Sequence, residues 1–282
     1  MAESVSTIEN RTQTGLVPAA QVARETPLRQ APNGIHFAAF GDNSIEPPEL
    51  DRMVQAVPAS IAAALARKAY YFVPLALAEG HAASSSAPRT GHEETMIAPA
   101  YTTDLADQAI CHRNVALEAI ASVSNTSSAP AVIIIPSEGV FISTRLLSDR
   151  FSLAFEFFIN VGHAFVDTAG VPESFNELAW NQAVADIRGE TSHDAWETRA
   201  LALTAKPQID EKAKTEFLEA AFADAVAIYL LSLAVDFDYS ELREREYPLL
   251  APQSLAERLR LIARLFPPNP TYDFAIRYRR RP

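Results

Sequence analysis

Cysteine is almost absent: Cys111 is the one cysteine in 282 residues, so no disulfide can form within the chain. The first residues also lack the charged and apolar regions of a secretory signal, and both features favour a reducing compartment. No uninterrupted apolar stretch reaches the roughly 20 residues that a membrane span needs, because the longest candidate, 222–235, contains Asp224. We therefore expect a soluble, cytoplasmic protein with no membrane partner.

Glycine and positive charge are also scarce. None of the nine glycines stands in a Gly-x-Gly-x-x-Gly or Gly-x-x-x-x-Gly-Lys arrangement, which excludes the common phosphate-binding loops. The 24 Lys and Arg against 35 Asp and Glu give a net charge of −11, and such an acidic surface repels phosphate backbones. Nucleic acid is therefore not an expected partner, and the oligomeric state stays open.

The chain is rich in apolar residues, at 48%, which is enough for one sizeable core. Residues 1–48 are dominated by helix- and strand-breaking residues, so we expect a flexible N-terminal tail in which 35–40 could add a strand. Order is expected from residue 49 onward, and residues 49–282 are predicted to form one domain.

Hydrophobic periodicity predicts strands first and helices later. The predicted strands are 70–75, 131–135 and 139–143. The predicted helices are 49–67 with a bend or a break at Pro58, 105–122, 152–166, 174–188, 193–205, 212–235 and 254–265. This order indicates an α+β fold with a small N-terminal sheet layer and a largely helical C-terminal half.

The helix predicted over 152–166 contains Gly162–His163–Ala164 within an apolar stretch. Zinc peptidases of the zincin type place two His at positions i and i+4 of one helix, with a Glu after the first that activates the metal-bound water. The Gly-His-Ala half and its apolar flanks resemble that helix. The first ligand position, however, holds Ile159, and the position of the catalytic Glu holds Asn160. Isoleucine cannot bind a metal, and an amide is no useful base.

A second helix extends the resemblance to zincins that take their third ligand from a Glu, such as anthrax lethal factor-like peptidases. The segment from Ala220 to Tyr229 is similar to their ligand helix, and Ala220 lies 57 residues after His163. The resemblance places Ala220 where the third ligand should be. It places Asp224 where an acid supports a metal-binding His. A carboxylate in so apolar a helix needs a partner, and His163 is the predicted one.

The resemblance implies a zincin-like domain over 49–282 without metal or cofactor, in which conventional peptidase activity is lost. We expect such a protein to act by binding a peptide or protein partner, with an extended peptide added along an edge strand at 139–143.

Three alternatives stay open. A metal-free enzyme would use His163, Asp224 and Asn160 on a small molecule. A hydrolase with an unconventional zinc site would recruit Glu216, His92 or His112. Finally, 152–166 could be a plain core helix whose histidine is only structural.

Overall fold

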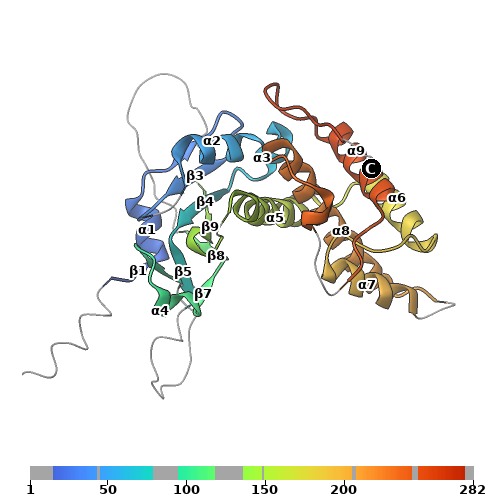
Figure 1. Cartoon of the computed structure of the whole chain (residues 1–282), viewed down its shortest axis with the longest axis horizontal. Helices are drawn as coiled ribbons and strands as arrows, with labels where there is room; N and C mark the ends of the chain where they lie inside the picture. The colour runs from blue at the N-terminus through green and yellow to red at the C-terminus, as the bar shows by residue number, and fades with distance from the viewer. Residues whose placement is uncertain are drawn as a thin grey trace, which may run out of the picture. The chain divides into compact units, whose positions relative to one another are not determined.

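The computed structural model describes residues 15–42, 45–78, 95–117, 136–147, 149–204, 208–242 and 247–276. Over these residues the fold mixes helices with two β-sheets (Figure 1). The chain divides into two compact units instead of the single domain expected from residue 49. Residues 1–50 and 66–149 belong to the sheet unit, and residues 51–65 and 150–282 to the helical unit.

The sheet unit contains a four-stranded and a five-stranded sheet. The first has the order β1 (Val17–Pro18), β6 (Thr95–Ala98), β5 (Leu75–Ala78) and β7 (Ala109–Ile110), all antiparallel. The second has the order β2 (Arg29–Gln30), β3 (His36–Ala39), β4 (Lys68–Val73), β9 (Glu138–Ser143) and β8 (His112–Ala116). Strands β3, β4 and β9 are parallel, and antiparallel β2 and β8 flank them.

Aromatic side chains hold the centre of the five-stranded sheet. Tyr71 and Phe141 stack with ring centroids 4.7 Å apart, and they belong to a buried cluster that also contains Ala19 and Val22 of α1 (Ala19–Glu25). Ser143 joins the two sheets, because its hydroxyl accepts the Ala76 N–H at 2.8 Å and donates to the Ile110 carbonyl. The same buried cluster includes Ala76 of β5 and Ile97 of β6, so the two sheets share an apolar interior.

Two expectations about the secondary structure of this half are wrong. Residues 17–39 supply α1, β1, β2 and β3, so the expected flexible tail does not extend through them. Strand β3, however, confirms that residues 35–40 could add a strand, and it pairs in parallel with β4. The helix expected over 105–122 does not form over 109–116, because β7 pairs with β5 and β8 pairs with β9, and these pairings override the local Ala-Leu pattern. The short α4 (Thr103–Ala106) overlaps the start of that range, and residues 118–122 lie outside the described residues. The strand expected at 131–135 lies outside the described residues.

Strand β9 confirms the prediction at 139–143, but β9 is not an edge. β4 pairs with one side and β8 with the other. The expected docking of a peptide along Gly139–Ser143 is therefore wrong, because β8 already occupies that side of the strand.

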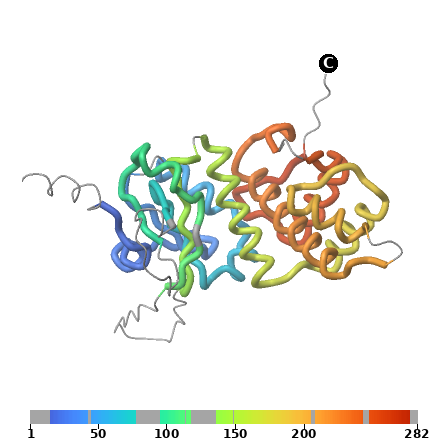
Figure 2. Tube along the Cα trace, turned by 90° about the horizontal axis from the view of Figure 1, so that it is seen from below, coloured from blue at the N-terminus to red at the C-terminus, as the bar shows by residue number. Residues whose placement is uncertain are grey.

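The helical unit confirms nearly every expected helix, and Figure 2 traces its C-terminal part as successive coils. The helix expected over 49–67 is interrupted at Pro58, as expected. The helices are α2 (Pro47–Gln55), which begins in the sheet unit, then α3 (Ala59–Ala64), α5 (Arg150–Ala169), α6 (Glu173–Val184), α7 (His193–Thr204), α8 (Glu211–Ala234) and α9 (Pro252–Leu265).

Helix α8 is the central element of the helical unit, where it packs against α5, α6, α7 and α9. The Asp210 carboxylate caps its start by accepting the N–H groups of Lys212 and Ala213. By length and composition α8 could cross a membrane, but 67% of its most apolar window is buried inside the protein. A core helix of this kind meets the same two criteria.

The C-terminal segment fastens α2 and α3 to the rest of the helical unit. Asn269 donates from its side-chain amide to the carbonyls of Gln55 and Val57, both at 2.8 Å, and accepts the Ala59 N–H at 3.1 Å. One side chain thereby satisfies the end of α2 and the start of α3, where backbone groups have no partner within the helix.

We expect Asn269→Ala to lower the free energy of unfolding by about 1–3 kcal/mol, because it leaves three backbone groups without their partner. Urea unfolding followed by circular dichroism measures this change. Asn181→Ala, on the exposed face of α6, is the matched control and should change stability by less than about 0.5 kcal/mol. Equal effects of the two substitutions would contradict the bridging role of Asn269.

Candidate functional site

Helices α5 and α8 approach each other closely at Gly162. A Cβ atom on Gly162 would lie 2.4 Å from the carbonyl oxygen of Ala223, so no larger residue fits without moving a helix. The Arg150 side chain, near the start of α5, donates to the carbonyl of Ala234 at the end of α8. The two helices therefore run antiparallel, and the Gly162–Ala223 contact fixes their register.

This register determines which predicted site residues lie at one level. With Gly162 opposite Ala223, Asp224 lies at about the level of Val161, midway between Ile159 and His163. Ala220 lies about one turn farther along, near the level of Phe165. The residue that faces the gap between the two predicted ligand positions is thus Asp224, which the sequence placed as a supporting acid.

The helical rotation decides which of these side chains share a side. Successive residues turn by about 100°, so Ile159 and His163 project from the same flank of α5 when seen from Gly162. Asp224 projects to that same flank of the antiparallel α8, and the charge of His163 acts on its carboxyl group. Three of the predicted residues thus converge.

Asn160 does not join them. It projects away from the contact with α8, by about 160° of helical rotation. Its side-chain amide donates to the backbone carbonyl of Glu156 at 2.8 Å and to the Glu156 carboxylate at 3.2 Å. The amide donors are therefore used within α5, which leaves Asn160 no part in the expected small-molecule pocket.

Asp224 obtains its hydrogen bonds from the connector between α6 and α7, residues 185–192. The Thr191 hydroxyl donates to Asp224 Oδ2 at 2.8 Å, and the Ser192 hydroxyl donates to the same carboxylate. Burial raises the pKa of Asp224 to about 6, although these two hydroxyls and the charges of His163 and Arg258 favour the ionised form. His163 itself is exposed, so the site opens to solvent on the α5 side.

The converging residues do not complete the zinc site that active members of the zincin family have. His163 and Asp224 could donate to a metal, but Ile159 cannot, and zinc sites of this kind take three protein ligands. Within the described residues no group of three His, Cys, Asp or Glu is placed to hold a metal. Glu216 is exposed beside Lys212, His112 lies in β8 of the sheet unit, and His92 is outside the described residues.

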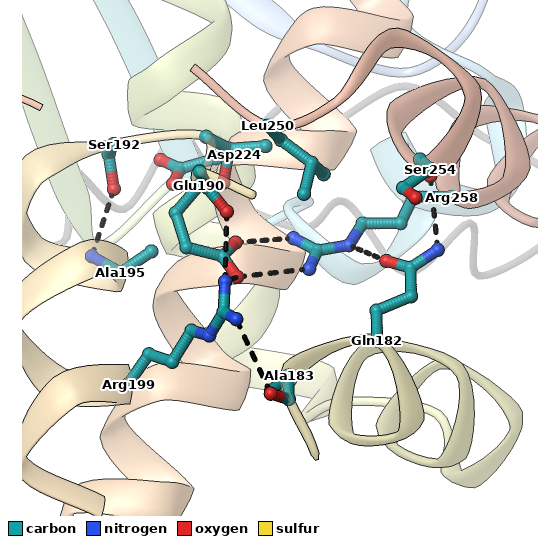
Figure 3. A network of polar contacts seen from close by, with 12 residues as sticks. Gln182, Ala183, Glu190, Ser192, Ala195, Arg199, Asp224, Leu250, Ser254 and Arg258 are labelled. Atoms are coloured by element: carbon teal, nitrogen blue, oxygen red, sulfur yellow. Dashed lines mark hydrogen bonds and ion pairs between the residues drawn. The ribbon is translucent and has the colours of Figure 1, made fainter. Parts of the chain in front are cut away.

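A buried charge cluster beneath Asp224 had not been anticipated from the sequence (Figure 3). Glu190, in the connector, is fully buried and lies between two arginines. Arg258 of α9 donates to Glu190 Oε2 at 2.9 Å, and Arg199 of α7 donates to Oε1 at 3.1 Å. Gln182 of α6 accepts from Arg258 Nε at 2.8 Å. Nothing in the local pattern marks these residues, because ordinary amphipathic helices also carry arginine and glutamate.

Comparison of the chain with models of known protein families, with curated proteins and with solved structures finds no match. The site must therefore be interpreted from its own geometry.

We expect Asp224→Asn to stabilise the protein near pH 7.5. The folded-state pKa of about 6 lies above the ordinary value of 3.8, so the ionised carboxylate opposes folding. The stability that the neutral acid contributes is present below about pH 4 and is lost as the pH rises through 6. An amide oxygen can still accept the two hydroxyls without ionising. The expected gain is about 1–2 kcal/mol at pH 7.5 and close to zero at pH 4.

Urea unfolding at the two pH values measures this difference. Asp167→Asn, one turn beyond His163 on the exposed surface of α5, is the control and should change stability by less than about 0.5 kcal/mol. A loss of stability in Asp224→Asn at pH 7.5 would show that the carboxylate is a purely structural acceptor.

Proposed function

We propose that this chain is a zincin-derived protein that has lost zinc peptidase chemistry and acts by binding a peptide or protein partner. The observation that carries the proposal is the convergence of Ile159, His163 and Asp224 on one side of the α5–α8 pair. A random pair of core helices has no reason to align a half zinc motif with a partly buried carboxylate. The apolar Ile159 and the internally bonded Asn160 remove the metal ligand and the base that hydrolysis requires.

The outer side of β8 is the proposed place for an extended peptide. Among the described strands, β8 forms one edge of the five-stranded sheet. The backbone bonds Ser143 N–H to Cys111 O and Leu117 N–H to Ser137 O assign the odd-numbered residues of this segment to β9. Asn114 and Ala116 consequently direct their backbone N–H and C=O groups outward, where a peptide strand can pair with them.

A metal-free enzyme is the second candidate, and the pKa of Asp224 near 6 favours it. An acid that titrates close to neutrality beside an exposed histidine can exchange protons with a small molecule. Asn160 is not part of this candidate, because its amide is bound to Glu156.

A first experiment tests the origin of the site with zinc. We expect the wild-type protein to bind no stoichiometric Zn²⁺ and to hydrolyse no unstructured peptide. Ile159→His adds an imidazole one turn before His163, so that Asp224 lies midway between the two histidines, and zinc affinity should rise at least about tenfold. Elemental analysis measures the zinc stoichiometry, and competition with a chromogenic chelator measures the zinc affinity.

Asp167→His is the matched control for this experiment. It also creates two histidines four residues apart, but on the side of His163 that faces away from the level of Asp224. An equal gain of affinity in both variants would contradict the convergence. Stoichiometric zinc in the wild-type protein would overturn the proposed loss of the metal site.

A second experiment tests the edge of β8 on arrayed unstructured peptides. Asn114→Pro removes an outward N–H and keeps every bond of β8 to β9, so peptide binding should fall at least about tenfold. Asn114→Ala keeps the N–H and should bind as the wild type does. Wild-type binding by Asn114→Pro, or the absence of any peptide ligand for the wild type, would argue against this location.

A further inference from the structure

The connector between α6 and α7 is irregular backbone that is held more firmly than a simple link between two helices requires. Glu190 N–H donates to the Pro248 carbonyl at 3.0 Å, and the Glu190 carbonyl accepts the Leu250 N–H at 2.9 Å. Gly189 has a φ of +83°, and a Cβ atom there would lie 2.2 Å from the Leu249 carbonyl oxygen. Only glycine allows the connector to lie so close to the segment that precedes α9.

The side chain of Glu190 adds two ion pairs to these backbone bonds. Arg258 reaches it from α9 and Arg199 from α7, and all three side chains are buried. Arg199 also donates to the carbonyls of Gly189 and Ala183. Burying three charges is a poor route to stability, because desolvation opposes most of the attraction between them. The ion pairs of Glu190 with Arg199 and Arg258 instead hold the connector backbone in one position relative to α7 and α9.

The two residues directly after Glu190 are the ones that reach the candidate site. Thr191 and Ser192 donate their hydroxyls to Asp224. The Ser192 hydroxyl also accepts the Ala195 N–H at 3.2 Å, and the Thr191 carbonyl accepts the Tyr247 hydroxyl at 3.1 Å. In Figure 3 Asp224 lies next to Glu190, with Ser192 at the start of α7. A small displacement of the connector would therefore withdraw both donors from the carboxylate.

We propose that the buried Arg199–Glu190–Arg258 cluster positions the His163–Asp224 site, by fixing the connector so that the Thr191 and Ser192 hydroxyls hold the Asp224 carboxylate. Glu190 acts through the backbone and not by contact with a ligand, so it is a positioning residue. The inference rests on the proposed function, which says what the His163–Asp224 site is for. Its test, however, needs neither a partner nor a metal.

The groups that face Asp224 determine what each perturbation does to it. His163 comes from α5, Arg258 from α9, and the two hydroxyls from the connector, and each of them favours the carboxylate form. Glu190 is negatively charged, like ionised Asp224, so its charge disfavours the carboxylate form of Asp224. If Glu190 acted on Asp224 only through its charge, its removal would lower the pKa of Asp224. If it positions the connector, its removal withdraws the hydroxyls and raises that pKa.

The test measures the titration of Asp224 by carboxyl ¹³C NMR in the full-length chain. Thr191→Val, nearly isosteric, sets the scale by removing one hydroxyl, and it should raise the pKa of Asp224. Glu190→Gln should raise it by at least as much. Gly189→Ala changes no charge but forces the connector off the Leu249 carbonyl, and it should do the same.

Two matched controls separate positioning from general damage. Gly170→Ala places alanine at a φ of +72° with nothing within 4 Å, so it strains the backbone equally without moving the connector. Glu257→Gln removes an exposed carboxylate that accepts from Gln182 at the edge of the same network. Both should leave the titration of Asp224 as in the wild type.

The outcomes are distinct. A raised pKa of Asp224 in Gly189→Ala or Glu190→Gln, with both controls unchanged, supports the proposal. A lowered or unchanged pKa in the folded variants overturns it. Should neither variant fold, Thr191→Val still decides, because an unchanged titration there would mean that the connector does not hold Asp224. Absence of a peptide ligand would affect only the proposed function.

Discussion

The close approach of α5 and α8 at Gly162 is the constraint on which the candidate site depends. With no side chain at this position, the α5 backbone rests on the carbonyl of Ala223, and this contact sets both the register and the facing sides of the two helices. His163 and Asp224 share a side for that reason. A larger residue at 162 would separate the helices and, with them, the two groups.

The irregular connector of the helical unit is a second constraint, of a different kind. Helices pack through apolar faces, but the connector and the segment before α9 meet through backbone hydrogen bonds and a carboxylate between two arginines. Charged side chains are usually exposed and most residues have a negative φ, but here Glu190, Arg199 and Arg258 are buried and Gly189 has a positive φ. Such departures are most common where a protein positions functional groups. The last two residues of the connector donate their hydroxyls to Asp224, and the ionised form of this carboxyl group opposes folding.

Much of the helical unit could be predicted from the sequence, because its long apolar periodicities and proline breaks are local signals. The sheet unit could not. Residues 35–40 indicated a strand, and β3 forms there against β4. β1 and β2 are too short to be indicated by their own sequence, and they form because β6 and β3 supply partners. Residues 109–116 have the composition of a helix, yet β7 extends along β5 and β8 along β9. The pairing partners lie far apart in the chain, and no local pattern encodes them.

The sequence by itself determined that Ile159 and Asn160 cannot perform zinc peptidase chemistry, since residue type alone decides whether a side chain binds metal or accepts a proton. It also located the two helices that carry His163 and Asp224. Tertiary structure decided the rest: that Asp224 faces the gap between Ile159 and His163, that Asn160 points away from α8, and that Glu190 is buried between two arginines next to Asp224. The physical reason is that register, rotation and the pairing of buried charges are properties of contacts between segments.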